Sequence, residues 1–142
     1  MNTEVLEFLR NNRVSVATTL LKNGLPHSAA LHYSHKDDPL TLYFSTESTS
    51  RKCEGMLDGI SVKASVVVGF DEKEWLTLQL EGEMRIVPKD ELVTAQEIHY
   101  KKHPSSEKWK NDPTTVILEF TPKWWRFTDL NVYPYRISSS EE

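Results

Sequence analysis

The chain has 142 residues, 38% of them hydrophobic and 27% charged, which suits a single domain with a packed core. Its formal net charge of −4 argues against a general nucleic-acid binder, which would show a basic face. The N-terminal segment has acidic residues and no long apolar run, so it predicts neither a signal peptide nor a membrane span. We therefore expect a cytoplasmic protein that has no nucleic-acid or membrane partner.

The first half of the chain predicts a helix followed by an antiparallel meander. Residues 3–11 predict the helix, with Thr3 as its N-cap. The dipeptide Asn23-Gly24 is a strong signal for a hairpin between two strands. The strands are expected at residues 14–21, 26–35 and 40–45.

The second half predicts more strands and two further helices. A short helix is expected at residues 49–58 and a longer one at 88–103, where Pro104 stops it. Gly82 predicts a bulge within its strand. The strands are expected at residues 61–70, 75–87, 115–121 and 123–128. Residues 1–137 then form one domain, and residues 138–142 form a flexible tail.

The order of these elements predicts the fold class. Six or seven strands with two or three flanking helices indicate a mainly β, α+β protein built as a closed or half-closed antiparallel barrel. A parallel βαβ sheet is excluded, because no helix separates the first three strands.

The segment from Leu42 to Cys53 is typical of a phosphate site. An apolar strand runs into hydroxyl residues that include Thr46 and Ser50, and the basic pair Arg51-Lys52 follows. Hydroxyl donors, positive charge and the start of a helix together favour an anion. The alternative is an ordinary helix cap beside solvated surface charge.

Other reactive side chains give weaker signals. His27, His32 and His35 lie too far apart along one strand to share a metal, so we expect no metal site and place these histidines on the surface or in a pocket. Cys53 is the only cysteine; it favours a reducing compartment, and we expect it to be buried rather than catalytic. Because no nucleophile motif is present, a cofactor would carry any chemistry.

Two adjacent tryptophans, Trp124 and Trp125, fall on an expected strand. Successive residues of a strand face opposite sides. We expect one ring to be buried in the barrel and the other to lie at a dimer or flavin surface.

Several segments taken together resemble the pyridoxamine 5′-phosphate oxidase-like superfamily of FMN-binding split barrels. They are FLRNNRVSVATTLLKNGLPHSAAL, YFSTESTSRK, LTLQLEGEMRIV and the helix ending in YKKHP, while WWRFTD resembles a small, poorly characterised branch. The resemblance implies a split β-barrel homodimer with FMN at the subunit interface.

The resemblance also implies positions for the cofactor. Backbone groups along strand two would line the flavin ring, and the loop after the third strand would hold the phosphate. The matching positions are Ser28, Ala29, Ala30, Leu31, Ser45, Thr46, Ser50, Arg51, Lys52 and Thr77. Ser28 and Tyr33 stand where the oxidase has basic residues, and LNVYPYRISSSEE lacks the oxidase's substrate-binding motif.

The resemblance therefore implies an FMN-binding flavoprotein that is not a true pyridoxamine 5′-phosphate oxidase. It would be a flavin-dependent oxidoreductase that transfers a hydride or electrons to an unknown small molecule or redox partner, with no catalytic residue assigned. One alternative is a flavin-binding or stress-related module without turnover. Another is haem binding on the same fold, supported only by the histidines.

Overall fold

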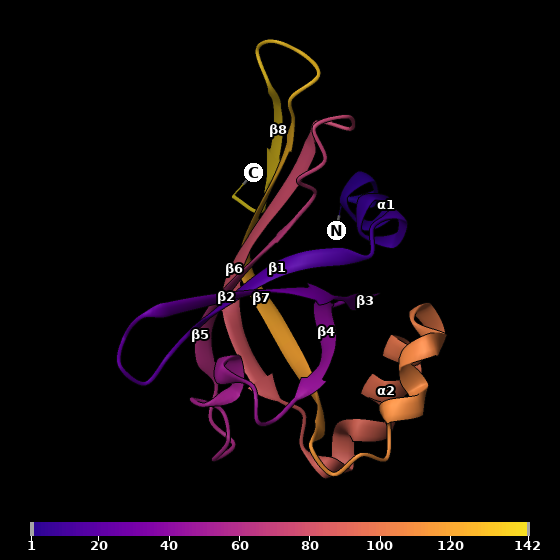
Figure 1. The fold of residues 1–142 in the computed structure, drawn as a ribbon. Helices are drawn as coiled ribbons and strands as arrows, with labels where there is room; N and C mark the ends of the chain where they lie inside the picture. The colour runs from indigo at the N-terminus through magenta and orange to yellow at the C-terminus, as the bar shows by residue number, and fades with distance from the viewer. Residues whose placement is uncertain (1, 142) are drawn as a thin grey trace.

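The computed structural model describes residues 2–141, which form one antiparallel sheet of eight strands curled into a half-open barrel (Figure 1). The strands are β1 (Val14–Leu20), β2 (Pro26–His32), β3 (Ser34–Asp37), β4 (Leu40–Glu47), β5 (Val62–Val68), β6 (Leu76–Ile86), β7 (Thr115–Asp129) and β8 (Arg136–Ser139). Their order is β2-β1-β5-β6-β7-β4-β3, and β8 pairs with β7. This architecture confirms the expected α+β split barrel.

Two α-helices and three 3₁₀ turns flank the sheet. The helices are α1 (Thr3–Asn11) and α2 (Leu92–Lys102), and the turns are η1 (Arg51–Cys53), η2 (Lys89–Glu91) and η3 (Pro104–Trp109). The predicted bounds of α1 are correct, but its cap is not Thr3: the Asn2 side chain accepts from the amides of Glu4 and Val5. Among residues 2–141, neither helix is long and apolar enough to cross a membrane.

Tyr33 divides the strand that was expected at 26–35. The strands on either side of it, β2 and β3, lie at opposite ends of the sheet order. Its amide donates to the Arg13 carbonyl at 3.1 Å, and its hydroxyl donates to the Leu9 carbonyl at 2.7 Å. The side chain is fully buried, and burial raises the pKa of its phenol. The chain thus crosses the open seam of the barrel at this residue.

The core fills the barrel and extends beneath α1. Phe8 of α1 packs edge-on against Phe127 of β7, with 5.1 Å between the ring centroids. The other large, fully buried side chains come mainly from the strands and include Phe44, Leu78, Leu80, Leu118 and Phe120. Burial alternates along β1 and most of β6, as the period-two pattern of a strand requires.

The bulge at Gly82 is confirmed, and it explains the length of β7. The pairing of β6 with β7 changes register between Glu81 and Gly82, opposite Trp124 and Pro122. A proline is tolerated within a sheet at such a bulge. The two strands predicted around Pro122 are therefore one strand.

The helix predicted at residues 49–58 is wrong. Only Arg51–Cys53 is helical, and successive i→i+3 bonds follow, from the amide of Met56 to Cys53 and from that of Gly59 to Met56. Gly55 lies within the segment, and Gly59 ends it with a φ of +84°. The α-helix N-terminus that the sequence placed beside the basic pair is therefore absent from residues 49–58.

Residues 136–141 pack against β7. Ser138 and Ser139, placed by the sequence in a flexible tail, pair with Phe127 and Arg126. The rings of the adjacent tryptophans take different environments: Trp125 packs against the core, whereas the Trp124 indole donates to Glu141 at 2.8 Å.

Candidate functional site

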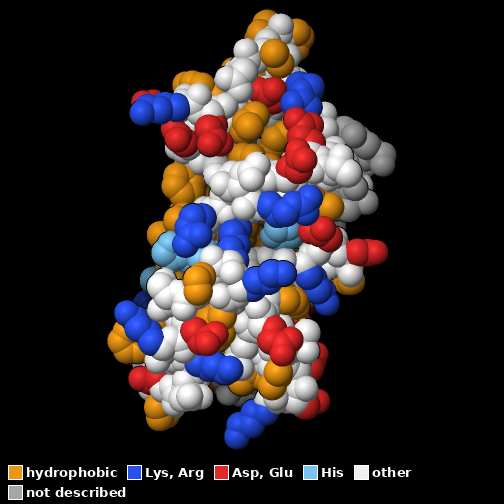
Figure 2. All heavy atoms as spheres, turned by 90° about the vertical axis from the view of Figure 1, so that its right-hand side faces the viewer, with side chains coloured by type: hydrophobic (Ala, Val, Ile, Leu, Met, Phe, Trp, Pro, Cys, Tyr) orange, Lys and Arg blue, Asp and Glu red, His pale blue; other side chains and the backbone are white. Residues whose placement is uncertain are grey.

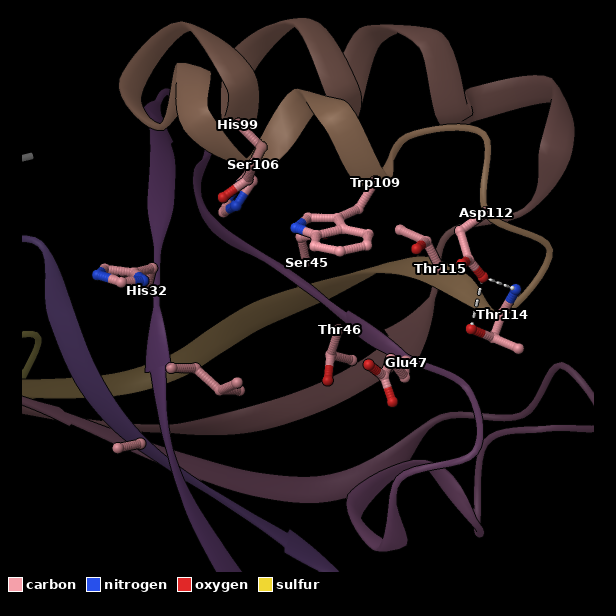
Figure 3. Close-up of a pocket in the computed structure, with 12 residues that line it drawn as sticks. His32, Ser45, Thr46, Glu47, His99, Ser106, Trp109, Asp112, Thr114 and Thr115 are labelled. Atoms are coloured by element: carbon pink, nitrogen blue, oxygen red, sulfur yellow. Dashed lines mark hydrogen bonds between the residues drawn. The ribbon is translucent and has the colours of Figure 1, made fainter.

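A groove opens between the free side of β2, the end of β4 and the segment from α2 to residue 115 (Figure 3). Its cavity volume is about 320 Å³. The lining residues are Ala30, Leu31 and His32 from β2, Ser45, Thr46 and Glu47 from β4, and His99, Ser106, Trp109, Asp112, Thr114 and Thr115 from the third side. We call this the β2–β4 groove.

The β2 wall presents backbone groups as well as side chains. The bond from the Tyr33 amide to Arg13 marks one hydrogen-bonded pair with β1. In an antiparallel ladder such pairs alternate with pairs whose N–H and C=O point away from the neighbouring strand. His32, opposite Val14, and Ala30, opposite Val16, form pairs of this second kind. Because β2 ends the sheet, the backbone N–H and C=O groups of Ala30 and His32 are free along its edge.

At the end of β4, the side chain of Lys52 contacts that of Thr46. Lys52 Nζ donates to Thr46 Oγ1 at 3.0 Å, and Thr19 Oγ1 donates to the Lys52 carbonyl at 3.1 Å. Ser50 Oγ donates to the Glu47 carbonyl at 2.7 Å, and the Arg51 side chain is exposed. The structure therefore brings Thr46 and Lys52 into direct contact, with Ser50 and Arg51 in the same turn.

Two carboxylates give the groove a mixed charge. Glu47 and Asp112 both line it. The Asp112 carboxylate accepts from the Thr114 amide at 2.9 Å and hydroxyl at 2.8 Å, and these bonds lower its pKa. An anion in this groove would have to bind near Lys52 and away from Asp112.

Three imidazoles lie in a row beside the groove, tilted relative to one another, with His103 between His32 and His99. The ring centroids are 5.1 Å apart for His32 and His103 and 5.0 Å apart for His103 and His99. His103 Nε2 lies 2.7 Å from the Tyr33 carbonyl, which can only accept, so this nitrogen carries the proton. His103 Nδ1 then accepts from Arg13 at 3.2 Å.

The inner imidazole, His99, is held neutral. Its Nδ1 lies 2.8 Å from the Ser34 hydroxyl, and burial, with the nearby His103 and His32, lowers its pKa to about 4. Burial also lowers the pKa of His103. Neither histidine was singled out from the sequence, although their i,i+4 spacing on a predicted helix was the available signal.

The histidines that were singled out do not converge. His27 and His32 lie on β2, and His35 Nε2 lies 3.1 Å from Asp37 Oδ1. Within residues 2–141, no group of three or more His, Cys, Asp or Glu side chains is arranged to hold a metal ion. His32, which lines the groove, is the one of the three placed at the candidate site.

The other expected site residues lie outside the groove. Ser28 and Ala29 lie further along β2, where the Ser28 hydroxyl is 2.7 Å from Thr18 Oγ1. Thr77 lies at the start of β6, away from the groove, and lines a separate hollow. Within one chain, the structure thus does not bring Thr77 together with Thr46 and Lys52. Cys53 is buried as expected, and burial raises the pKa of its thiol.

Comparison with known proteins matches this chain to one family. The model of the pyridoxamine 5′-phosphate oxidase family matches residues 1–129. A comparison with curated proteins found no match.

Solved structures share the fold at low sequence identity. A haem-binding protein from Mycobacterium smegmatis has a TM-score of 0.74 at 15% identity, covering 94% of this chain and 56% of the other. This chain therefore spans a little over half of that protein. A Clostridium acetobutylicum protein related to general stress protein 26 of B. subtilis, of the pyridoxinephosphate oxidase family, has a TM-score of 0.71 at 18% identity, covering 98% and 94%. Campylobacter jejuni ChuZ has a TM-score of 0.73 at 12% identity, covering 89% and 55%.

The family match covers most of the chain, and the half-open barrel with its groove beside β4 agrees with it. The chain belongs to the pyridoxamine 5′-phosphate oxidase-like family.

Proposed function

We propose that the protein binds FMN in the β2–β4 groove, with the phosphate held at the end of β4. The observation that carries this proposal is the 3.0 Å contact between Lys52 Nζ and Thr46 Oγ1. It fixes an ammonium and a hydroxyl at the groove, and charge-assisted bonds to phosphate are among the stronger hydrogen bonds in proteins. Ser45 and Arg51 lie on the same strand end and turn and would add donors, while the Ser50 hydroxyl holds the turn through its bond to the Glu47 carbonyl.

The rest of the groove suits a planar ligand with polar edges. The free backbone groups of Ala30 offer a donor and an acceptor along one wall. The indole of Trp109 extends from η3 toward the groove from the opposite side (Figure 3). Aromatic side chains with backbone donors nearby are typical of cofactor sites. Ser28, Ala29 and Leu31 of β2 would extend this wall, while Thr77 could take part only from another copy of the chain.

Bound flavin would supply hydride or electron transfer. The chain's own residues would bind and orient the flavin, and we assign no catalytic side chain. A flavin-binding or stress-related module without turnover would use the same site.

Two positions disfavour activity as a true pyridoxamine 5′-phosphate oxidase. Ser28 is not basic, and the Tyr33 hydroxyl is already bonded to the Leu9 carbonyl. Cys53, a buried free thiol, is consistent with a protein that functions in a reducing compartment such as the cytoplasm.

We further propose that the protein works as a homodimer. The cavity volume of about 320 Å³ is at the small end for a cofactor site, and the groove is open on one side. Trp109, which lines it, is 56% exposed. A two-fold contact would enclose the ligand and cover this ring.

Haem is the second candidate ligand. His32 lines the groove, and no hydrogen bond to its ring occurs within residues 2–141, so this imidazole could hold a haem iron. The fold neighbour from M. smegmatis is a haem-binding protein. The shared fold alone does not carry that ligand to this chain, and the Lys52–Thr46 contact favours a phosphorylated one.

The visible spectrum of the protein titrated with each ligand separates the two candidates. We expect the flavin band near roughly 450 nm to shift and flavin fluorescence to fall on addition of FMN. A Soret shift with haem that disappears in His32→Ala, with no change on addition of FMN, would replace this proposal with haem binding.

A further inference from the structure

A second hollow lies beside β3 and the end of α2. It is bounded by the last turn of α1, by β3 and by the end of α2, and its volume is about 590 Å³. Its charged and titratable lining residues are Arg10, His35, Lys36, Asp37, Lys101 and Lys102. On this face Figure 2 shows Lys and Arg side chains gathered around a histidine. We call it the basic hollow.

The positive charge of the basic hollow is only partly neutralised. Asp37 is its single carboxylate, and this side chain is shared by Arg10 Nη1 at 3.2 Å and His35 Nε2 at 3.1 Å. The ion pairs formed within residues 2–141 include none with Lys36, Lys101 or Lys102. Ammonium groups left without carboxylates in one concavity attract an anion.

Lys102 is held in place and partly removed from water. Its Nζ donates to the Leu9 carbonyl at 2.9 Å and lies 4.1 Å from the centroid of the Tyr33 ring. An ammonium has three donors, and this hydrogen bond uses one of them. Burial, with the nearby Arg13, lowers the pKa of Lys102 to about 8. A bound anion would stabilise the charge that burial disfavours.

We propose that the basic hollow binds a small organic phosphate monoester. Lys36, Lys101 and Lys102 all line the hollow and would attract a doubly charged phosphate, and Ile98 in the same hollow offers an apolar surface to the organic part. The volume is within the range of small-molecule sites, and a concave site suits a small molecule better than a flat membrane surface. The hollow and the β2–β4 groove share no lining residue, so this proposal does not rest on FMN binding.

Calorimetric titration with phenyl phosphate at low ionic strength tests the proposal. We expect saturable binding with one site per chain. Lys36→Gln with Lys101→Gln should weaken it at least roughly tenfold, because removing a charge-assisted hydrogen bond costs about that factor or more. The matched control is Lys73→Gln with Lys89→Gln, which removes the same charge at exposed positions elsewhere and should leave binding unchanged. Thermal melts of both double variants verify that they are folded.

Further measurements identify the binding site and the class of ligand. Phenyl phosphate should raise the pKa of Lys102 in an NMR titration, and Arg51→Ala with Lys52→Ala should not affect this binding. Equal weakening by both glutamine double variants, absence of binding, or weakening only in the Arg51/Lys52 variant would overturn the proposal. Binding to anionic lipid vesicles that phenyl phosphate does not displace would assign the face to a membrane and would equally overturn it.

Discussion

Gly82 on β6 approaches Thr121 on β7 so closely that a Cβ atom at position 82 would overlap the Thr121 carbonyl oxygen. The backbone of Pro122 lies against the same point. This close approach sits at the change of register between the two strands, and it allows β7 to continue past a proline. Glycine is therefore required here for close approach of the backbone.

Gly82→Ala should lower the free energy of unfolding by about 1–3 kcal/mol, because the strands must separate to admit the methyl group. Urea denaturation measures the change. Glu81→Ala, an exposed neighbour in the same bulge, should change stability by about 0.5 kcal/mol or less. A Gly82→Ala variant as stable as the wild type would show that β6 and β7 are further apart at this point.

Trp125→Ala should cost more stability than Trp124→Ala. Trp125 packs against the core but is only partly buried, so we expect about 2–3 kcal/mol, below the value for a fully buried ring. The Arg126 guanidinium lies over the Trp124 ring, and the Trp124 indole donates to Glu141, so removal of this side chain should cost about 1 kcal/mol. Thermal melts compare the two variants, and identical melts would mean that the rings do not lie on opposite faces.

Stability should fall as the pH drops from about 6.5 to about 4. The usual pKa of histidine is 6.5, and in the folded protein that of His99 is lowered to about 4. In this window the unfolded chain binds more protons than the folded one, so the free energy of unfolding decreases toward acid, by on the order of 3 kcal/mol for His99. His103 and His35, whose pKa values are also lowered by burial, act in the same direction.

Denaturant titrations at several pH values measure this dependence. His99→Gln keeps a polar side chain beside Ser34 and should flatten the acid-side slope. An unchanged slope in that variant would mean that His99 is not the neutral, buried group described above.

The protein should be a dimer at micromolar concentration. A two-fold contact that closes the groove would cover the exposed Trp109 ring. Light scattering measures the mass, and Trp109→Ala should shift the equilibrium toward monomer. A wild-type monomer across this range would contradict the dimer.

Local signals in the sequence predicted most of the barrel. Asn23-Gly24 predicted the first hairpin, where Gly24 has a φ of +87°. Gly82 predicted the bulge. The hairpin follows from the backbone conformation that glycine allows, and a glycine within a strand is itself a signal of close backbone approach, so a single segment is enough to predict both.

The features that were missed depend on distant segments. Tyr33 divides a strand because Leu9 and Arg13 accept its hydrogen bonds. The third wall of the groove, with Trp109 and Asp112, comes from a segment after α2 that carried no motif. The helix expected at 49–58 is a local exception: tight turns replace it, and Gly59 ends them with a φ of +84°. Thr46 and Lys52, which the sequence placed at one phosphate site, contact each other in the structure because one short loop carries both.

Comparing the affinities for FMN and riboflavin tests the central claim most directly, since the two ligands differ only in the phosphate. Arg51→Ala with Lys52→Ala should weaken FMN binding at 25 °C by about 1.5–3 kcal/mol for each hydrogen bond to the phosphate that is removed, and it should leave riboflavin binding nearly unchanged. Lys73→Ala with Lys89→Ala, which removes the same charge elsewhere, is the control. Fluorescence titration of the wild type and both double variants gives the affinities. Equal weakening for FMN and riboflavin, or no weakening for either, would contradict a phosphate site at the end of β4.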